Sequence, residues 1–106
     1  MISNSDNIVR DFLLGFIKIH ILHHAGREPV YGSWLLSELG RHGYTLSPGT
    51  LYPVLHGLEK SGYLSRSEEI VDGKVRKYYH ITPAGRSALH EAREKMSELI
   101  SEVLRE

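Results

Sequence analysis

The chain has no cysteine among its 106 residues, and neither sign of charge is in excess. The missing thiols exclude disulfides, thiolate metal ligands and thiol catalysis, which fits a reducing compartment. The 13 basic and 13 acidic side chains cancel, and this balance argues against a nonspecific binder of polyanions. A local basic patch can still contact nucleic acid, because the distribution of charge matters more than its sum.

Long apolar runs are also missing. The longest one near the start, residues 12–22, is interrupted by Gly15, Lys18 and His20. It is too short and too polar to span a bilayer. Residues 1–7 contain neither a basic segment nor a cleavage signal for secretion. We therefore expect a cytoplasmic protein that has no membrane partner.

Catalytic motifs are missing as well. The sequence has no glycine-rich phosphate loop, no nucleophile elbow and no paired carboxylates on an apolar face. We expect neither an enzyme nor a cofactor. A chain of this length forms one domain with a modest core, so burial of apolar surface between subunits is expected.

The most informative segment that is present spans residues 47–62 and has the pattern of a short helix. Ser47 can accept hydrogen bonds from the first backbone N–H groups, and Pro48 suits the first helical position. Gly62 ends the pattern. The apolar residues recur at helical spacing and form one face: Leu51, Val54, Leu55 and Leu58.

The opposite face of this predicted helix is polar and rich in hydrogen-bonding groups. Its side chains are those of Thr50, Tyr52, His56 and Lys60. Hydroxyl, imidazole and ammonium groups can reach base edges and phosphates. We therefore predict a recognition helix that enters the major groove of double-stranded DNA.

A β-hairpin is predicted directly after the recognition helix. Residues 63–71 and 75–81 have the composition of strands. Between them, Asp72-Gly73 is a strong signal for a two-residue turn. A hairpin in this position is typical of the wing of a winged helix-turn-helix.

The tip of the predicted wing is basic. It carries Lys74, Arg76 and Lys77, and clustered cations suit phosphates or the minor groove. Tyr78 is a further candidate for DNA contact. Strand alternation alone leaves open whether Tyr78 or Tyr79 faces outward.

Three more helices and a short extended segment complete the expected order. The helices cover residues 6–24, with Asp6 as the N-cap, residues 31–41, and residues 83–104, which follow a Thr82-Pro83 start signal. Residues 44–46 are interpreted as a small strand.

This order predicts a mainly α protein with a small β-hairpin, an α+β winged helix-turn-helix with an appended C-terminal dimerisation helix. Residues 1–82 would form the DNA-binding domain, and residues 83–106 the dimerisation helix of the same structural unit.

The first and last helices carry more apolar surface than one small domain covers. In the last helix, apolar residues alternate three and four positions apart, which is the spacing of a coiled-coil seam. The predicted homodimer interface comprises Phe12, Phe16, Leu89, Ala92, Met96, Leu99, Ile100 and Val103. Of these, Phe12, Phe16 and Met96 line either a dry dimer core, which we favour, or a ligand pocket between subunits.

Two longer blocks, Leu46–His56 and Arg76–Thr82, resemble the PadR-like transcriptional regulators. The match covers residues 31–85 and includes Tyr31-Gly32 and Gly85. The resemblance implies a homodimeric DNA-binding regulator, usually a repressor, often released by a small aromatic or cationic effector. It adds Tyr31, Ser47 and Gly49 to the predicted DNA contacts. We therefore expect a sequence-specific, ligand-responsive repressor that binds an inverted-repeat operator.

Two alternatives remain open. The neutral net charge and Gly57 also suit a winged-helix module that binds protein. A metal-responsive sensor would use His20, His23 and His24, which lie within one helical turn of one another. We favour helix-end placement for these three and expect no metal, because no carboxylate or thiol completes the set nearby. His42 is interpreted as solvated.

Overall fold

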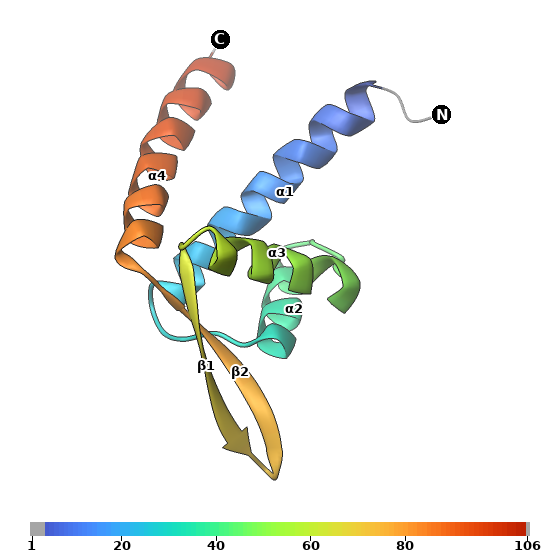
Figure 1. The fold of residues 1–106 in the computed structure, drawn as a ribbon. Coiled ribbons are helices and arrows are strands. Elements are labelled where there is room, and N and C mark those ends of the chain that lie inside the picture. Colours follow the sequence, from blue (N-terminus) through green and yellow to red (C-terminus); the bar gives the residue numbers. More distant parts are fainter. Residues whose placement is uncertain (1–3, 106) are drawn as a thin grey trace.

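The computed structural model describes the backbone of residues 4–105 and the side chains of residues 7–105. Over this part of the chain the elements follow one another as shown in Figure 1. They are α1 (Asn4–Ala25), α2 (Gly32–Arg41), α3 (Pro48–Lys60), β1 (Leu64–Val71), β2 (Lys74–Ile81) and α4 (Pro83–Val103). The expected α+β winged helix-turn-helix is confirmed.

The elements form a small body with projections at opposite ends. Figure 1 shows α1 and α4 leaving the body on the same side and diverging, while the hairpin extends the other way. The molecule measures 54 × 36 × 25 Å. No helix among the described residues is both long enough and apolar enough to cross a membrane.

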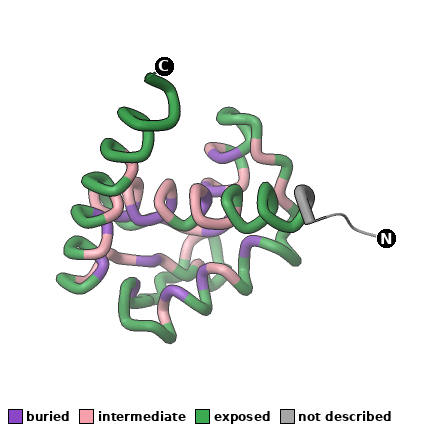
Figure 2. The backbone as a smooth tube through the Cα atoms, turned by 90° about the horizontal axis from the view of Figure 1, so that it is seen from above, coloured by how far each residue is buried: buried purple, intermediate pink, exposed green. Residues whose placement is uncertain are grey.

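The core lies where α1, α2, α3 and the base of the hairpin meet. Leu35 and Leu39 from α2, together with Leu51 and Leu55 from α3, are inaccessible to solvent. Figure 2 shows the buried residues gathered in this region, whereas the last turns of α4 are exposed. The apolar face predicted for residues 47–62 is therefore the face that α3 packs inward.

The hairpin has the expected turn and is tied to the body at its base. Asp72 and Gly73 both have positive φ, 51° and 76°, as a type I′ turn requires. Tyr79 is fully buried. Of the two neighbouring tyrosines, Tyr79 therefore faces the core and Tyr78 faces outward. Its amide donates to the Val30 carbonyl (2.7 Å), and the Val30 amide donates to the Tyr79 carbonyl (3.0 Å). Val30 thus pairs with β2 as an isolated antiparallel bridge.

Three local predictions were wrong. Helix α1 begins at Asn4, so Asp6 lies inside the helix and is not its N-cap. Ser47 occupies the N-cap position of α3 but makes no side-chain capping bond, because its Oγ pairs with the Thr50 hydroxyl (3.3 Å). Residues 44–46 form no strand: Val30 pairs with β2 instead, and the Tyr44 amide donates to Leu39 at the end of α2.

Replacing Leu55 by alanine should lower the free energy of unfolding by about 2–5 kcal/mol, because the side chain is inaccessible and its loss leaves a cavity. Urea denaturation measures this. Ile70→Ala is the matched control, since Ile70 is 78% exposed on the wing and its truncation should cost less than about 0.5 kcal/mol. Equal losses in the two variants would contradict the placement of the core.

Candidate nucleic-acid interface

Helix α3 divides cleanly into a buried and an exposed face. Leu51, Leu55 and Leu58 are buried in the core. The four residues predicted to meet DNA all lie on the exposed side of the helix: Thr50, Tyr52, His56 and Lys60. Ser47 and Gly49 are exposed at the start of the helix. The structure therefore places six of the predicted DNA contacts on one surface.

Tyr52 is held in place by an unusually close approach to α2. A Cβ atom added to Gly32 would collide with the hydroxyl and ring of Tyr52. Any larger residue at this position would move the Tyr52 ring, and Gly32 is itself buried at the first position of α2. Tyr52 remains 37% exposed, so its ring both packs on α2 and faces solvent. Gly32 is a positioning residue that we noted in the sequence only as part of the family resemblance.

Tyr31, Arg76 and Tyr78 form a second group at the root of the wing. The Arg76 guanidinium lies 4.1 Å from the centre of the Tyr31 ring, a cation–π contact. The Tyr31 and Tyr78 rings meet edge to face, with centroids 5.5 Å apart. A hydrogen bond with Tyr78 raises the pKa of Arg76 above its ordinary value.

A groove separates this part of the wing from the start of α2 and α3. It has a volume of about 710 Å³, with Tyr31, Gly32 and Tyr52 on one side. The wing supplies the opposite side, lined by Val71, Asp72, Lys74, Val75, Arg76 and Lys77. The groove thus joins the residues predicted on the recognition helix to those predicted on the wing.

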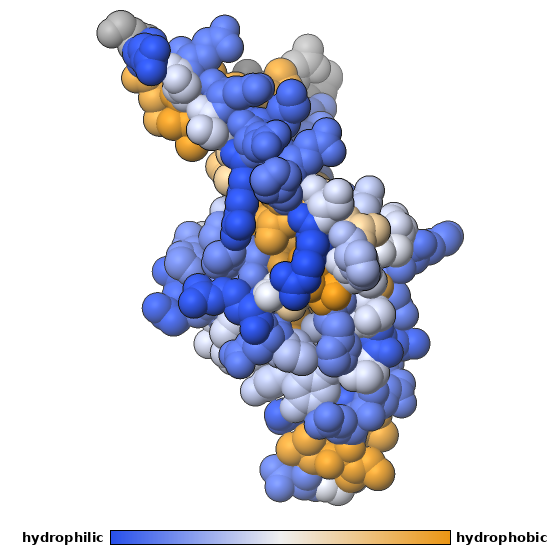
Figure 3. Space-filling model, turned by 90° about the vertical axis from the view of Figure 1, so that its left-hand side faces the viewer, coloured by the Kyte–Doolittle hydropathy of each residue, from blue (hydrophilic) through white to orange (hydrophobic). Residues whose placement is uncertain are grey.

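The three wing cations do not form a single charged tip. Because side chains alternate along a strand, Lys74 and Arg76 share one face of the hairpin, and Lys77 lies on the other. The ladder places Glu68 opposite Lys77 and Glu69 opposite Arg76. An apolar patch also lies at this end of the molecule in Figure 3, where Ile70 and Val75 are exposed. The alternation and the facing glutamates dilute the positive charge that the sequence suggested.

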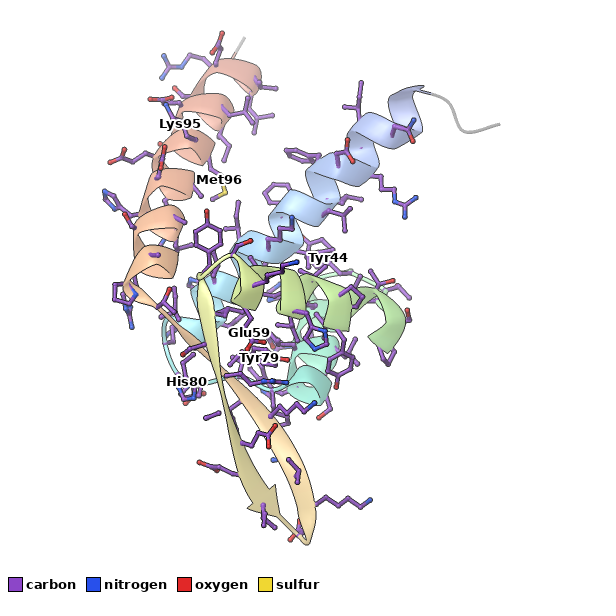
Figure 4. The ribbon with its side chains drawn as sticks, viewed as in Figure 1. Tyr44, Glu59, Tyr79, His80, Lys95 and Met96 are labelled. Carbon is purple, nitrogen blue, oxygen red and sulfur yellow. The ribbon has the colours of Figure 1, made fainter. Side chains whose placement is uncertain are left out.

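The α1–α4 side contains an apolar cleft, and Figure 4 shows Met96 pointing from α4 toward α1. Phe12 and Phe16 stack edge to face with centroids 4.5 Å apart. Both line the cleft with Met96, Leu99 and Ile100. The structure therefore brings together the three residues predicted for a dimer core or ligand pocket.

Leu89 and Ala92 differ from the rest of the predicted dimer seam. Leu89 is buried against the core of its own chain, which leaves it little surface for a partner. Ala92 is half-buried, whereas Leu99, Ile100 and Val103 are exposed on the free part of α4. The surface available to a partner therefore lies toward the C-terminal end of α4.

The histidines are arranged differently from the prediction. His23 turns toward α4, where its Nδ1 is 3.3 Å from the Arg93 guanidinium. His20 and His24 instead gather with His42, which is exposed as predicted, beside the Glu38 carboxylate. The carboxylate that the sequence around α1 did not supply for these histidines comes from α2.

Together, these elements define a winged helix-turn-helix protein. The model of the transcriptional regulator PadR-like family matches residues 21–91. The transcriptional regulator Rv3488 of Mycobacterium tuberculosis is 52% identical over 96 residues, which cover 91% of this chain and 90% of that protein.

Solved structures agree with this match. A PadR-like transcription factor from Bacteroides fragilis has a TM-score of 0.80 and 32% identity, covering 92% of this chain and 96% of that one. A PadR-like transcriptional regulator from Bacillus cereus has a TM-score of 0.77 and 32% identity, covering 91% and 98%. The chain belongs to the PadR-like family of transcriptional regulators and is not an enzyme.

Gly32→Ala should displace the Tyr52 ring, because the new methyl group collides with its hydroxyl end, and should lower the free energy of unfolding by at most about 1 kcal/mol, since this partly exposed ring can turn aside. In a Tyr52→Ala background the same change should cost far less, which a double-mutant cycle measured by urea denaturation detects. Gly40→Ala is the matched control in the same helix. No atom lies within 4 Å of its added Cβ, so it should gain about 0.5–1 kcal/mol.

Proposed function

We propose that the protein is a sequence-specific repressor that binds double-stranded DNA as a homodimer. The observation that supports DNA contact best is the two-sided character of α3. Its leucines are buried, while Thr50, Tyr52, His56 and Lys60 are exposed to solvent on the other side of the helix. In this proposal α3 enters the major groove, where these side chains contact base edges and phosphates.

The wing contacts the DNA backbone beside the major groove in this proposal. Lys74 and Lys77 are exposed, and Arg76 is fixed against Tyr31. Each cation that neutralises a phosphate releases a condensed counterion, so binding depends on salt. A winged-helix module that binds protein has no need of such salt-dependent cations, and the salt dependence therefore separates the two functions.

Lys74→Ala/Lys77→Ala should weaken binding to the operator and reduce the slope of log K against log salt by about 2 for each protomer. The measurement is fluorescence anisotropy with the DNA upstream of the gene, at several salt concentrations. Lys95→Ala is the control, since Lys95 lies on α4, far from the wing (Figure 4), and should leave the slope unchanged. A double variant with the wild-type slope would remove the wing from the interface.

The homodimer is proposed from the apolar surface that α1 and α4 leave uncovered. Phe12 is 51% exposed and Leu99 49% exposed, and both border the same cleft. Small domains seldom leave so many large apolar side chains in water, and burial by a second copy is the simplest remedy. A two-fold symmetric dimer then matches an inverted repeat with half-sites about 10 base pairs apart, or a multiple of this.

Leu99→Glu should convert the dimer to a monomer, because it places a charge in the proposed apolar interface. Sedimentation equilibrium measures the mass, which should fall to that of one 12.0 kDa chain. Ile70→Glu is the control: Ile70 is also a large apolar residue and is more exposed than Leu99, but it lies on the wing, so the dimer should persist. A wild-type protein that is already monomeric at micromolar concentration would overturn the proposed dimer.

Response to a small effector is the final part of the proposal. The cleft between Phe12, Phe16 and Met96 has a volume of about 270 Å³ and an almost wholly apolar lining. This lining suits an aromatic compound better than a charged one. Such a compound changes repression only if it binds the two states of the dimer unequally and so shifts the distance between the wings.

A further inference from the structure

Three histidines and one glutamate converge where α1 passes the C-terminal end of α2. His20 and His24 lie one turn apart on α1, and His42 follows α2. One ring nitrogen from each of the three lies within 4.8 Å of the others. Glu38, on the last turns of α2, adds a carboxylate: its Oε2 is 3.2 Å from the Nε2 of His42 and 3.5 Å from the Nε2 of His24.

Two of these separations, those from Glu38 to His24 and to His42, are those of ligands that share one ion. Two ligand atoms at about 2.0–2.1 Å from zinc and at the tetrahedral angle lie about 3.3 Å apart. The Glu38 oxygen already has this separation from both His24 and His42. The i, i+4 spacing of His20 and His24 presents both rings on one side of α1. His20 lies farther from the carboxylate, since only the three histidines share the 4.8 Å limit, and its imidazole must rotate toward Glu38 when an ion binds.

The surroundings favour ligand chemistry over an ordinary polar contact. The side chains of His24 and Glu38 are only 15% and 13% exposed. The buried Nε2 of His24 has no hydrogen-bond partner among the described residues, and a polar atom left in this state is costly. The other oxygen of Glu38 pairs with Arg41 (2.8 Å), which orients the carboxylate as an outer hydrogen bond orients a ligand.

The protonation states of these side chains also favour the binding of a cation. Burial, helped by the neighbouring His42, lowers the pKa of His20, and burial likewise lowers the pKa of His24. Burial would raise the pKa of Glu38, but the hydrogen bond with His42 and the charge of Arg41 outweigh it and lower that pKa. Neutral imidazoles and an ionised carboxylate are the forms that bind metal ions.

We propose that His20, His24, His42 and Glu38 form a binding site for one divalent transition-metal ion of the kind that prefers imidazole ligands, with zinc as the reference ion. Three imidazoles and a carboxylate fill a tetrahedral shell without thiolate, in a chain that has no cysteine. The site joins α1 to α2, and an ion bound there stabilises the folded chain by mass action.

Titration of tag-free protein with Co²⁺, in the absence of DNA, tests the site. One ion per chain should bind, produce the visible absorption of a tetrahedral Co²⁺ complex, and be displaced by Zn²⁺. Trp34 is the single tryptophan, and its ring centroid lies 5.3 Å from that of His24. Bound Co²⁺ should therefore quench the tryptophan fluorescence, which gives a second readout at this place in the fold.

Variants locate the ion. His42→Gln should weaken Co²⁺ binding by more than about tenfold, and because His42 is exposed this variant should fold normally. His24→Gln should do the same, with circular dichroism checking its fold. His23→Gln is the matched control on the same turn of α1, since His23 faces Arg93. It should bind as the wild type does.

Failure to bind Co²⁺, or equal binding by wild type and His42→Gln, overturns the proposed site. Loss of binding in His23→Gln also overturns it, because the ion would then lie elsewhere. None of these measurements includes DNA, so their outcome is independent of the proposed operator binding.

Discussion

The antiparallel bridge between Val30 and Tyr79 determines where the wing stands relative to the helices. Its two backbone hydrogen bonds fix the base of β2 beside the segment that leads into α2. Because Tyr79 is fully buried, the bridge lies inside the core and is shielded from competing water. Tyr31 follows Val30 directly, and the bridge therefore brings it against Arg76 and Tyr78 at the root of the wing.

The recognition helix depends on the same segment of chain. Gly32 opens α2 two residues after the bridged Val30, and its missing side chain allows Tyr52 of α3 to pack against the backbone. The wing, the start of α2 and the start of α3 are thus positioned together and share one groove. A regulator that reads two adjacent features of DNA needs this rigidity, because contacts separated in sequence must arrive with fixed spacing.

Helix α1 runs from the projecting α1–α4 side of the molecule into the core (Figure 1). Its first turns carry exposed apolar residues beside α4, and its last turns enter the core and carry the histidines that approach α2. The proposed dimer surface and the histidine cluster therefore share one continuous helix.

The sequence alone determined the elements, because helix and strand periodicity, the Asp72-Gly73 turn and the proline start signals are local properties that act over a few residues. The division of α3 into a leucine face and a polar face followed from the same periodicity. Only the tertiary structure decided which distant residues meet: Gly32 with Tyr52, Val30 with Tyr79, and His42 with the histidines of α1. No periodicity encodes such pairs, because they depend on how the helices are placed relative to one another. For the same reason, the sequence grouped His23 with His20 and His24, whereas in the structure His42 joins these two and His23 contacts Arg93 instead.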